Sequence, residues 1–204
     1  MVLILISKIR KVHSIMIQYF KIICLFLLTL YAVPIYSQSS KIENSPKYDR
    51  DLFGGWSDTD RDCQNMRHEL LQELSTAVVS FSQNTCRVTL GRWLDPYTDK
   101  IFYESRLLDI DHLVPLKYSW DRGAYSWTSK KRRQFSNDPI NLFAVEKSVN
   151  RQKSASGPAE WLPPNIKFRC QYITRFQRVV KLYALSQSDA ELGAIKQIQQ
   201  KYCD

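Results

Sequence analysis

The stretch "LLDIDHLVPL", Leu107 to Leu116, places two carboxylates and a histidine among apolar residues. The segment "RLLDIDH" reads as a short strand that ends with the pair Asp111 and His112. Adjacent side chains of a strand point to opposite faces. The two residues can therefore serve different tasks in one site only if the strand ends there and the chain turns.

A second strand and a short helix or turn follow, and each contains an asparagine. The segment "INLFAV" includes Asn141, and "EKSVNRQKS" includes Asn150. A hard cation such as Mg²⁺ prefers oxygen ligands, and a carboxylate plus an amide suffice when water and phosphate complete its shell. Asp111 and Asn150 could supply these oxygens. A neutral His112 could take a proton from water, and Arg151 could neutralise phosphate charge, as could Lys153.

Together, "DIDHLVPL" and "SNDPINLFAVEKSVNRQKSASGPAEW" resemble the HNH family of ββα-metal nucleases, in the branch whose last motif residue is Asn. Three further segments are similar to small exported bacterial HNH proteins related to GmrSD-type nuclease domains: "GGWSDTDRDCQNMRHELL", "CRVTLGRWLDPYT" and "GPAEWLPPN". The resemblance covers about residues 48–183. Arg61 departs from it, because a glycine is expected at that turn position.

The resemblance implies a role for each matched residue. Asp111 and Asn150 correspond to the two ligands of the metal ion, which is expected to be Mg²⁺ or Mn²⁺. His112 corresponds to the general base. Asn141 corresponds to the middle residue of the motif, which braces the loop and helps to orient the histidine. The implied fold is α+β, a ββα-metal core with flanking helices and disulfides.

Each of these residues also has a purely structural interpretation. Asp111 could cap a helix or turn, and His112 could be a core histidine. Arg151 and Lys153 fit a solvated face as well as a phosphate contact, and the basic run 130–133 is more typical of a solvated surface. Because both asparagines are in register with the motif, the functional interpretation is favoured for Asp111 and His112.

The first 37 residues differ from the rest of the chain. An apolar run from Ile22 to Val33 follows basic residues and precedes small polar ones, which predicts a signal peptide over 1–37. A membrane anchor is the competing interpretation, but the run is short for a span of about 20 apolar residues. Residues 38–48 read as a loose leader and 49–204 as the nuclease domain. Met1 and Met16 are both possible starts.

Cleavage of the signal peptide would change the charge of the chain. Residues 1–37 contain four basic residues and no acidic residue, so their removal lowers the net charge from +9 to +5. A net charge of this size suits a polyanionic partner, and it suits plain solubility equally well.

Four cysteines remain after the predicted cleavage, because Cys24 lies within the signal segment. An even number in an exported chain predicts disulfides. Four cysteines allow three pairings, and the pairing of neighbours in sequence is preferred. No Cys-x-x-Cys pair supports a zinc site instead. The expected bridges are Cys63–Cys86 and Cys170–Cys203.

The remaining pattern predicts helices and one hairpin around the central strands. Helices are expected at 64–75, 170–183 and 189–202, a hairpin at 86–103, and a long insertion at 115–139. His68 and Glu69 are expected on the exposed side of the first helix.

These observations predict an exported, metal-dependent endonuclease of low sequence specificity. We expect it to be a monomer that is secreted or periplasmic in a bacterium, without stable membrane insertion. Its expected partner is nucleic acid, with DNA favoured over RNA. Two alternatives remain open. One is a non-catalytic nucleic-acid-binding protein on a nuclease scaffold, and the other is a delivered toxin, which would need an immunity partner.

Overall fold

The computed structural model describes residues 46–203. The predicted signal peptide and residues 38–45 of the predicted leader lie outside the described residues. Among the residues that are described, no helix is both long enough and apolar enough to cross a membrane.

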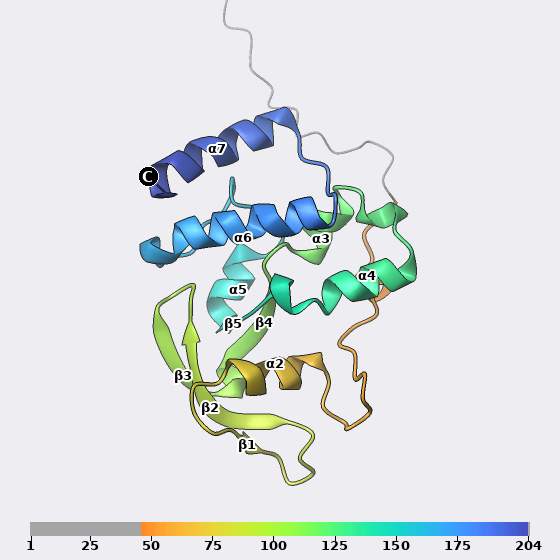
Figure 1. The fold of residues 1–204 in the computed structure, drawn as a ribbon, viewed down its shortest axis with the longest axis vertical. Coiled ribbons are helices and arrows are strands. Elements are labelled where there is room, and N and C mark those ends of the chain that lie inside the picture. The colour runs from red at the N-terminus through yellow and green to blue at the C-terminus, as the bar shows by residue number, and fades with distance from the viewer. Residues whose placement is uncertain (1–45, 204) are drawn as a thin grey trace, which may run out of the picture. The chain divides into compact units, whose positions relative to one another are not determined.

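A strand pair and a short helix form the centre of the described unit (Figure 1). Strand β4 (Leu108–His112) pairs antiparallel with β5 (Leu142–Glu146), so that Asp111 lies opposite Phe143. Helix α5 (Lys147–Lys153) follows β5 directly and contacts both strands. Both strands and the short helix predicted from the sequence are therefore confirmed.

Both faces of the β4–β5 pair are covered. Strand β5 accordingly reads as an apolar run, whereas β4 alternates apolar residues with two aspartates. On one face, Leu108 and Ile110 pack in a smaller core with helix α2 (Met66–Leu74) and strand β2 (Val88–Asp95). On the other face, the larger core contains Phe143 and Val145 of β5.

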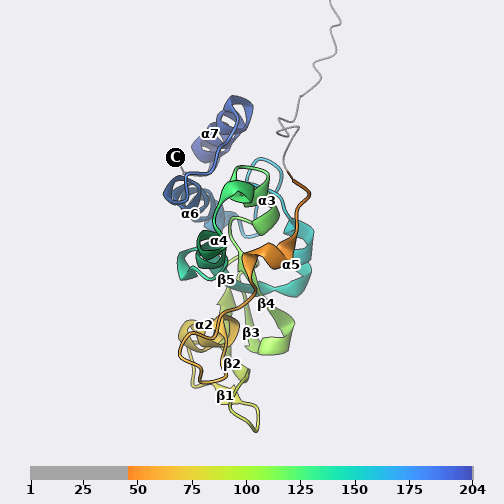
Figure 2. The ribbon, with the colours of Figure 1, turned by 90° about the vertical axis from the view of Figure 1, so that its right-hand side faces the viewer.

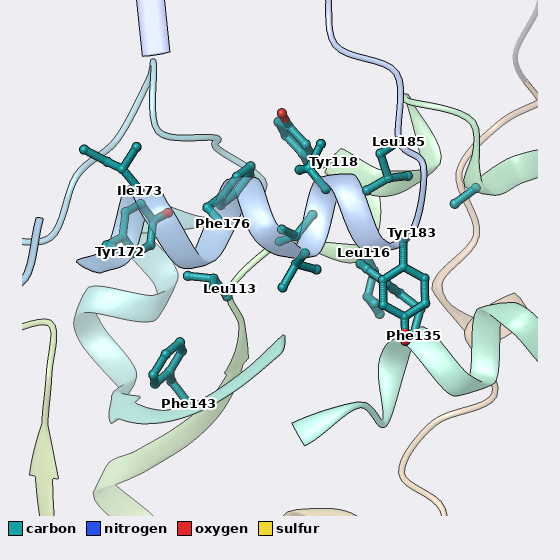
Figure 3. Close-up of a cluster of buried hydrophobic side chains, with 14 of the residues drawn as sticks. Leu113, Leu116, Tyr118, Phe135, Phe143, Tyr172, Ile173, Phe176, Tyr183 and Leu185 are labelled. Carbon is teal, nitrogen blue, oxygen red and sulfur yellow. The ribbon is translucent and has the colours of Figure 1, made fainter. Parts of the chain in front are cut away.

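Helix α6 (Arg169–Leu182) supplies much of the larger core (Figure 3). Tyr172, Ile173 and Phe176 lie on its buried side at helical spacing, and all three have no exposed surface. Helix α7 (Asp189–Cys203) packs against α6.

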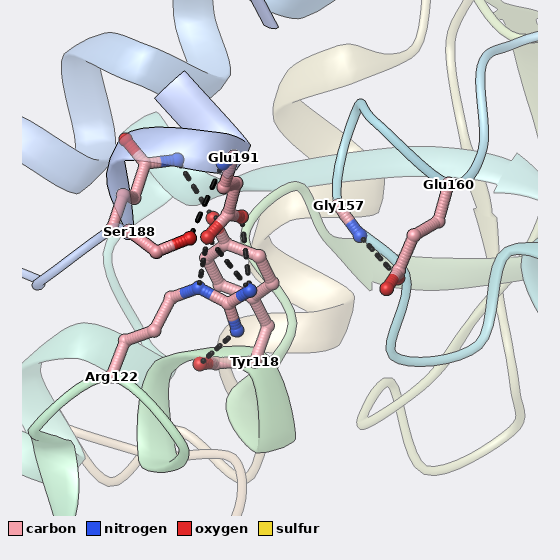
Figure 4. Close-up of polar contacts among 7 residues, drawn as sticks. Tyr118, Arg122, Gly157, Glu160, Ser188 and Glu191 are labelled. Carbon is pink, nitrogen blue, oxygen red and sulfur yellow. Dashed lines mark hydrogen bonds and ion pairs between the residues drawn. The ribbon is translucent and has the colours of Figure 1, made fainter. Parts of the chain in front are cut away.

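Helix α7 is attached by the buried Ile195, by the partly buried Ile198 and Tyr202, and by polar contacts and a disulfide. Figure 4 shows Glu191 of α7 accepting hydrogen bonds from Arg122 and Tyr118. The nearest Arg122 nitrogen lies 2.9 Å from the Glu191 carboxylate.

The predicted hairpin at 86–103 is confirmed as part of a three-stranded antiparallel sheet. Strands β1 (Ser80–Phe81), β2 and β3 (Lys100–Glu104) pair in the order β1-β2-β3. Figure 2 shows this sheet and α2 on the same side of the β4–β5 pair.

The long insertion predicted at 115–139 was too coarse a description, because this stretch is largely helical. It contains α3 (Leu116–Trp120) and α4 (Ser129–Ser136), and Thr128 caps α4 by accepting a hydrogen bond from the Lys131 amide. The aromatic side chains of Trp120 and Phe135 are buried in the larger core. The described chain also contains short 3₁₀ helices: Arg50–Phe53, Ser105–Leu107, Ala124–Ser126, Pro139–Asn141 and Ile166–Phe168.

Both predicted disulfides are present. Cys63 bonds to Cys86, which ties the loop before α2 to the start of β2, and Cys170 bonds to Cys203, which ties α6 to α7. The described chain is thus a mixed α+β fold with two disulfides, as predicted.

Candidate functional site

The polar residues of β4 divide between the two faces of the strand pair. Asp111 faces α5, where Lys153 contacts it, and Asp109 faces Asn150 of the same helix. His112 points the other way, toward Ser136 and Trp56. On the α5 side the structure therefore brings Asp111 to Lys153 and Asp109 to Asn150, and it places the His112 ring on the opposite face.

Asp111 is the centre of a buried polar cluster. Its Oδ1 lies 3.0 Å and its Oδ2 2.9 Å from the ammonium nitrogen of Lys153. The hydroxyl of Tyr97 donates to Oδ2 at 2.7 Å. Burial raises the pKa of Asp111, against the opposing effect of Lys153. Both carboxylate oxygens thus have hydrogen-bond donors from inside the protein.

Lys153 is internal, which differs from the prediction that it contacts substrate phosphate. Its side chain is 0% exposed, and its ammonium also donates to the backbone carbonyl of His112 at 2.8 Å. Burial lowers the pKa of Lys153, and Asp111 opposes this effect. In this arrangement the charge of Lys153 neutralises that of Asp111. Arg151, two residues before Lys153 on α5, has an exposed side chain.

His112 is held by contacts on two sides. Its Nε2 lies 2.9 Å from the carbonyl oxygen of Ser136, and its ring stacks on the indole of Trp56 at 5.3 Å between centroids and 1° between planes. Burial lowers the pKa of His112 to about 3, so the ring is neutral at pH 7. When Nε2–H donates to Ser136, Nδ1 remains free to accept a proton.

The segment that carries Trp56 is fixed to the end of α4. The Asn137 side chain accepts a hydrogen bond from the Ser57 amide at 2.8 Å and donates to the Gly55 carbonyl at 3.0 Å. The indole over His112 is thus positioned by backbone contacts as well as by stacking.

Asn141 is fully buried beside the turn that follows His112. Its Oδ1 accepts from the amide of Val114 at 2.8 Å, its Nδ2 donates to the Val114 carbonyl at 3.3 Å, and its backbone carbonyl accepts from Leu113 at 2.8 Å. These bonds fix the chain just after His112. A role of Asn141 in orienting the histidine ring remains a prediction.

Asp109 was not among the predicted site residues. Its Oδ2 accepts a hydrogen bond from Nδ2 of Asn150 at 3.2 Å, and its side chain is partly exposed. The two-residue step from Asp111 places both carboxylates on one strand face, and that signal could have identified Asp109. Tyr97 and Trp56 were also missed, although both lie in segments that resemble the family, because their contacts with β4 come from other parts of the chain.

The donor set on the α5 side suits a hard divalent cation. Asp109 on β4 and Asn150 on α5 adjoin each other with a carboxylate and an amide, whereas both oxygens of the neighbouring Asp111 are occupied by Lys153 and Tyr97. Mg²⁺ and Mn²⁺ prefer such oxygen ligands.

Comparison with known proteins shows to which family of proteins this chain belongs. The chain belongs to the family described as GmrSD restriction endonucleases, C-terminal domain, which matches residues 63–198. This confirms the relationship predicted from the sequence, and the matched range includes the whole polar cluster on β4 and α5.

One relative is described as an uncharacterized secreted protein and comes from the fungus Arthroderma benhamiae. It is 37% identical over 150 residues, which cover 72% of this chain and 72% of the relative. No solved structure matches the chain.

Proposed function

We propose that this protein is an exported, metal-dependent endonuclease that hydrolyses phosphodiester bonds with little sequence specificity. One observation supports the proposal above the others. At the end of β4, a buried neutral histidine directly follows a strand face that carries two carboxylates, one of which, Asp109, adjoins the amide of Asn150. This arrangement lies within the part of the chain that matches the restriction endonuclease family.

His112 acts as the general base in the proposed reaction. Its low pKa keeps it neutral at pH 7, and the Ser136 carbonyl fixes Nε2, so that Nδ1 takes the proton of the attacking water. Trp56 covers one face of the ring and restricts how water and substrate approach it.

The proposed cation is Mg²⁺ or Mn²⁺, which would be held by Asn150 with the β4 carboxylates, Asp111 being the ligand predicted from the sequence. When bound, it would polarise the scissile phosphate. Arg151 lies on the same helix as Asn150 and its side chain is exposed. In the proposed complex it would neutralise the charge of a substrate phosphate.

A cavity between the start of α2 and the start of β2 supports a polyanionic substrate. Its volume is about 590 Å³, and its lining includes Arg67, His68 and Arg87 but no acidic side chain. Arg67 connects it to β4, because its guanidinium donates to the Leu108 carbonyl at 3.0 Å. The predicted exposed position of His68 was wrong, since this side chain is half-buried and its Nδ1 accepts from the Val88 amide at 3.2 Å.

Two observations support export. Both disulfides are of the kind that persists in oxidising compartments, and the fungal relative is described as secreted. We propose that the protein acts outside the cytosol, on DNA in preference to RNA.

Nicking of supercoiled plasmid tests the function directly. Wild-type protein should nick the plasmid in the presence of Mg²⁺ or Mn²⁺, and excess EDTA should abolish this activity. His112→Ala should lose about 10²–10⁴-fold in rate, the usual contribution of a general base. Arg151→Ala should nick more slowly than wild type, while Arg178→Ala, which removes an exposed arginine of α6, serves as its matched control.

Three outcomes would contradict the proposal. They are cleavage by wild type in excess EDTA, a wild-type rate from folded His112→Ala, and no cleavage with any divalent cation. If wild type binds DNA by fluorescence anisotropy without cleaving it, the protein is a non-catalytic binder instead. The cover of Trp56 over His112 is the observation that favours this second candidate.

A further inference from the structure

We propose that the cavity between the start of α2 and the start of β2 binds one backbone phosphate of the nucleic-acid substrate, several nucleotides away from the scissile bond. This inference rests on the proposed function and adds a second contact with the same substrate. It is carried by the basic side chains that line the cavity and by the face of the β4–β5 pair on which the cavity lies.

The lining of the cavity concentrates positive charge. Arg67 and Arg87 are both part of it, together with His68, and no acidic side chain is. Burial lowers the pKa of His68, and the charges of the two arginines lower it further, so both guanidinium groups act on the same ring. Like charges held close together repel each other, and a bound anion relieves that repulsion.

The same side chains offer hydrogen-bond donors to a phosphate. Within the described chain, the exposed guanidinium of Arg87 has no hydrogen bond or ion pair. Arg67 is anchored to the Leu108 carbonyl at 3.0 Å through one terminal nitrogen. Nδ1 of His68 accepts from a backbone amide of β2 at 3.2 Å, so the neutral ring carries its proton on Nε2. Charged donors of this kind form strong hydrogen bonds with phosphate oxygens.

A disulfide holds the cavity in shape. Cys63 and Cys86 are bonded to each other, and both line the cavity. The bridge therefore fixes the segment before α2 against the start of β2 whether or not a ligand is present. A site that is already formed costs less ordering entropy when it binds.

The position of the cavity relative to His112 sets which phosphate it can reach. Leu108, Ile110 and His112 point to one face of β4, and Leu108 and Ile110 pack there with α2 and β2. The cavity thus lies on the His112 face. Arg67 binds the Leu108 carbonyl, four residues before His112, so the two positions are about 13 Å apart along the strand.

This separation corresponds to a short step along DNA. Successive phosphates of one strand are about 3.4 Å apart along the axis of the duplex. A duplex that runs along β4 therefore brings a phosphate about four nucleotides from the scissile bond to the cavity.

Binding of a labelled DNA duplex in EDTA tests the inference without relying on cleavage. Fluorescence anisotropy measures the Kd at several salt concentrations. Arg87→Ala should raise the Kd by about tenfold, because a hydrogen bond to a charged group is lost. It should also reduce the slope of log K against log salt concentration by about 0.9, the value for one phosphate contact. Arg178→Ala removes another exposed arginine and should change neither quantity.

Two further pairs of variants separate charge from structure. Arg87→Lys keeps the charge and should keep the salt slope, whereas Arg87→Glu should weaken binding more than Arg87→Ala does. Arg178→Lys and Arg178→Glu are the matched controls. Circular dichroism checks the fold of each protein, and thiol titration checks that its disulfides are intact.

Cleavage of an end-labelled duplex with Mg²⁺ locates the contact along the DNA. Arg87→Ala should slow the cuts that lie more than about four nucleotides from one end of the duplex. Cuts nearer that end should proceed at the wild-type rate, because no phosphate then reaches the cavity.

The inference is overturned if the Arg87 variants bind DNA with the same Kd and salt slope as the Arg178 variants, or if wild type does not bind DNA. Equal slowing of every cut by Arg87→Ala places the contact at the scissile bond and also overturns it. Wild-type binding and cleavage by the Arg87 variants reject the inference alone. Binding that depends on Arg87, without cleavage by wild type in any divalent cation, rejects the nuclease proposal alone.

Discussion

Lys153 joins three parts of the molecule at a single buried ammonium. It contacts Asp111 on β4, the His112 carbonyl at the end of the same strand and, through Asp111, the hydroxyl of Tyr97. Burial of an ion pair is costly, and its attraction offsets that cost only when the remaining donors and acceptors are satisfied. Here Tyr97 and the carbonyl provide that satisfaction.

Removal of one partner from this pair should destabilise the protein strongly. We expect Lys153→Met to lower the free energy of unfolding by about 3–5 kcal/mol, since it leaves Asp111 buried without its counter-charge. Asp111→Leu combined with Lys153→Met should cost much less. Urea unfolding measures both, with the exposed Arg151→Ala as a control expected within about 0.5 kcal/mol. If Lys153→Met is as stable as wild type, the ion pair of Lys153 with Asp111 contributes nothing to the free energy of unfolding.

The sequence identified some of these residues and missed others for a physical reason. Asp111, His112, Asn141 and Asn150 occur in a local motif with fixed spacing, so they could be found without a structure. The burial of Lys153 depends on how α5 docks on β4, and Tyr97 comes from the turn between β2 and β3. Such contacts are set by tertiary packing, which no local pattern records.

Among the elements, the strand pair was predictable and the helical insertion was not. Strand β5 is a short apolar run, as burial on both faces produces, and β4 alternates Leu108 and Ile110 with two aspartates. Helix α4, by contrast, buries only Phe135 and Ser136 and is otherwise rich in basic residues, so its apolar periodicity is weak. Its cap at Thr128 was the available signal.

Helix α7 should depend on its disulfide more than other helices do. Replacing Cys170 and Cys203 by Ala should cost about 2–4 kcal/mol, because the bridge closes a long loop of the unfolded chain and Ile195 is the one buried residue of α7. Hydrogen exchange should show faster exchange in α7. Replacing Cys63 and Cys86 is the matched control, and it should leave α7 protection unchanged. Equal protection of α7 in both variants would contradict the prediction.

At the scale of the whole molecule, the β4–β5 pair separates two hydrophobic cores. The larger core includes α6, and the smaller one includes α2 and β2. His112 sits at this junction with its ring buried, so its ionisation affects the stability of the folded unit rather than of one element.

Stability should fall as the pH drops below about 6.5, the usual pKa of histidine. Between pH 6.5 and 3 the unfolded chain binds a proton at position 112, whereas the folded chain, with its pKa of about 3, does not. This residue alone then contributes a slope of about 1.4 kcal/mol per pH unit. His112→Gln should lack this part of the slope. Urea unfolding in EDTA at several pH values between 3 and 6.5 measures the free energy of unfolding of both proteins. If this free energy falls equally steeply with pH in wild type and in His112→Gln, the lowered pKa of His112 is contradicted.

The positions of the two disulfides have a consequence for survival among extracellular proteases. The covalent loops enclose residues 63–86 and 170–203, and the site residues of β4, β5 and α5 lie between them, whereas Trp56 precedes the first loop. A single cut inside either loop leaves the two fragments joined, whereas a single cut between the loops divides the chain into two unlinked pieces. The middle of the chain must therefore resist proteolysis by packing alone, and it is there that β4, β5 and their buried neighbours lie.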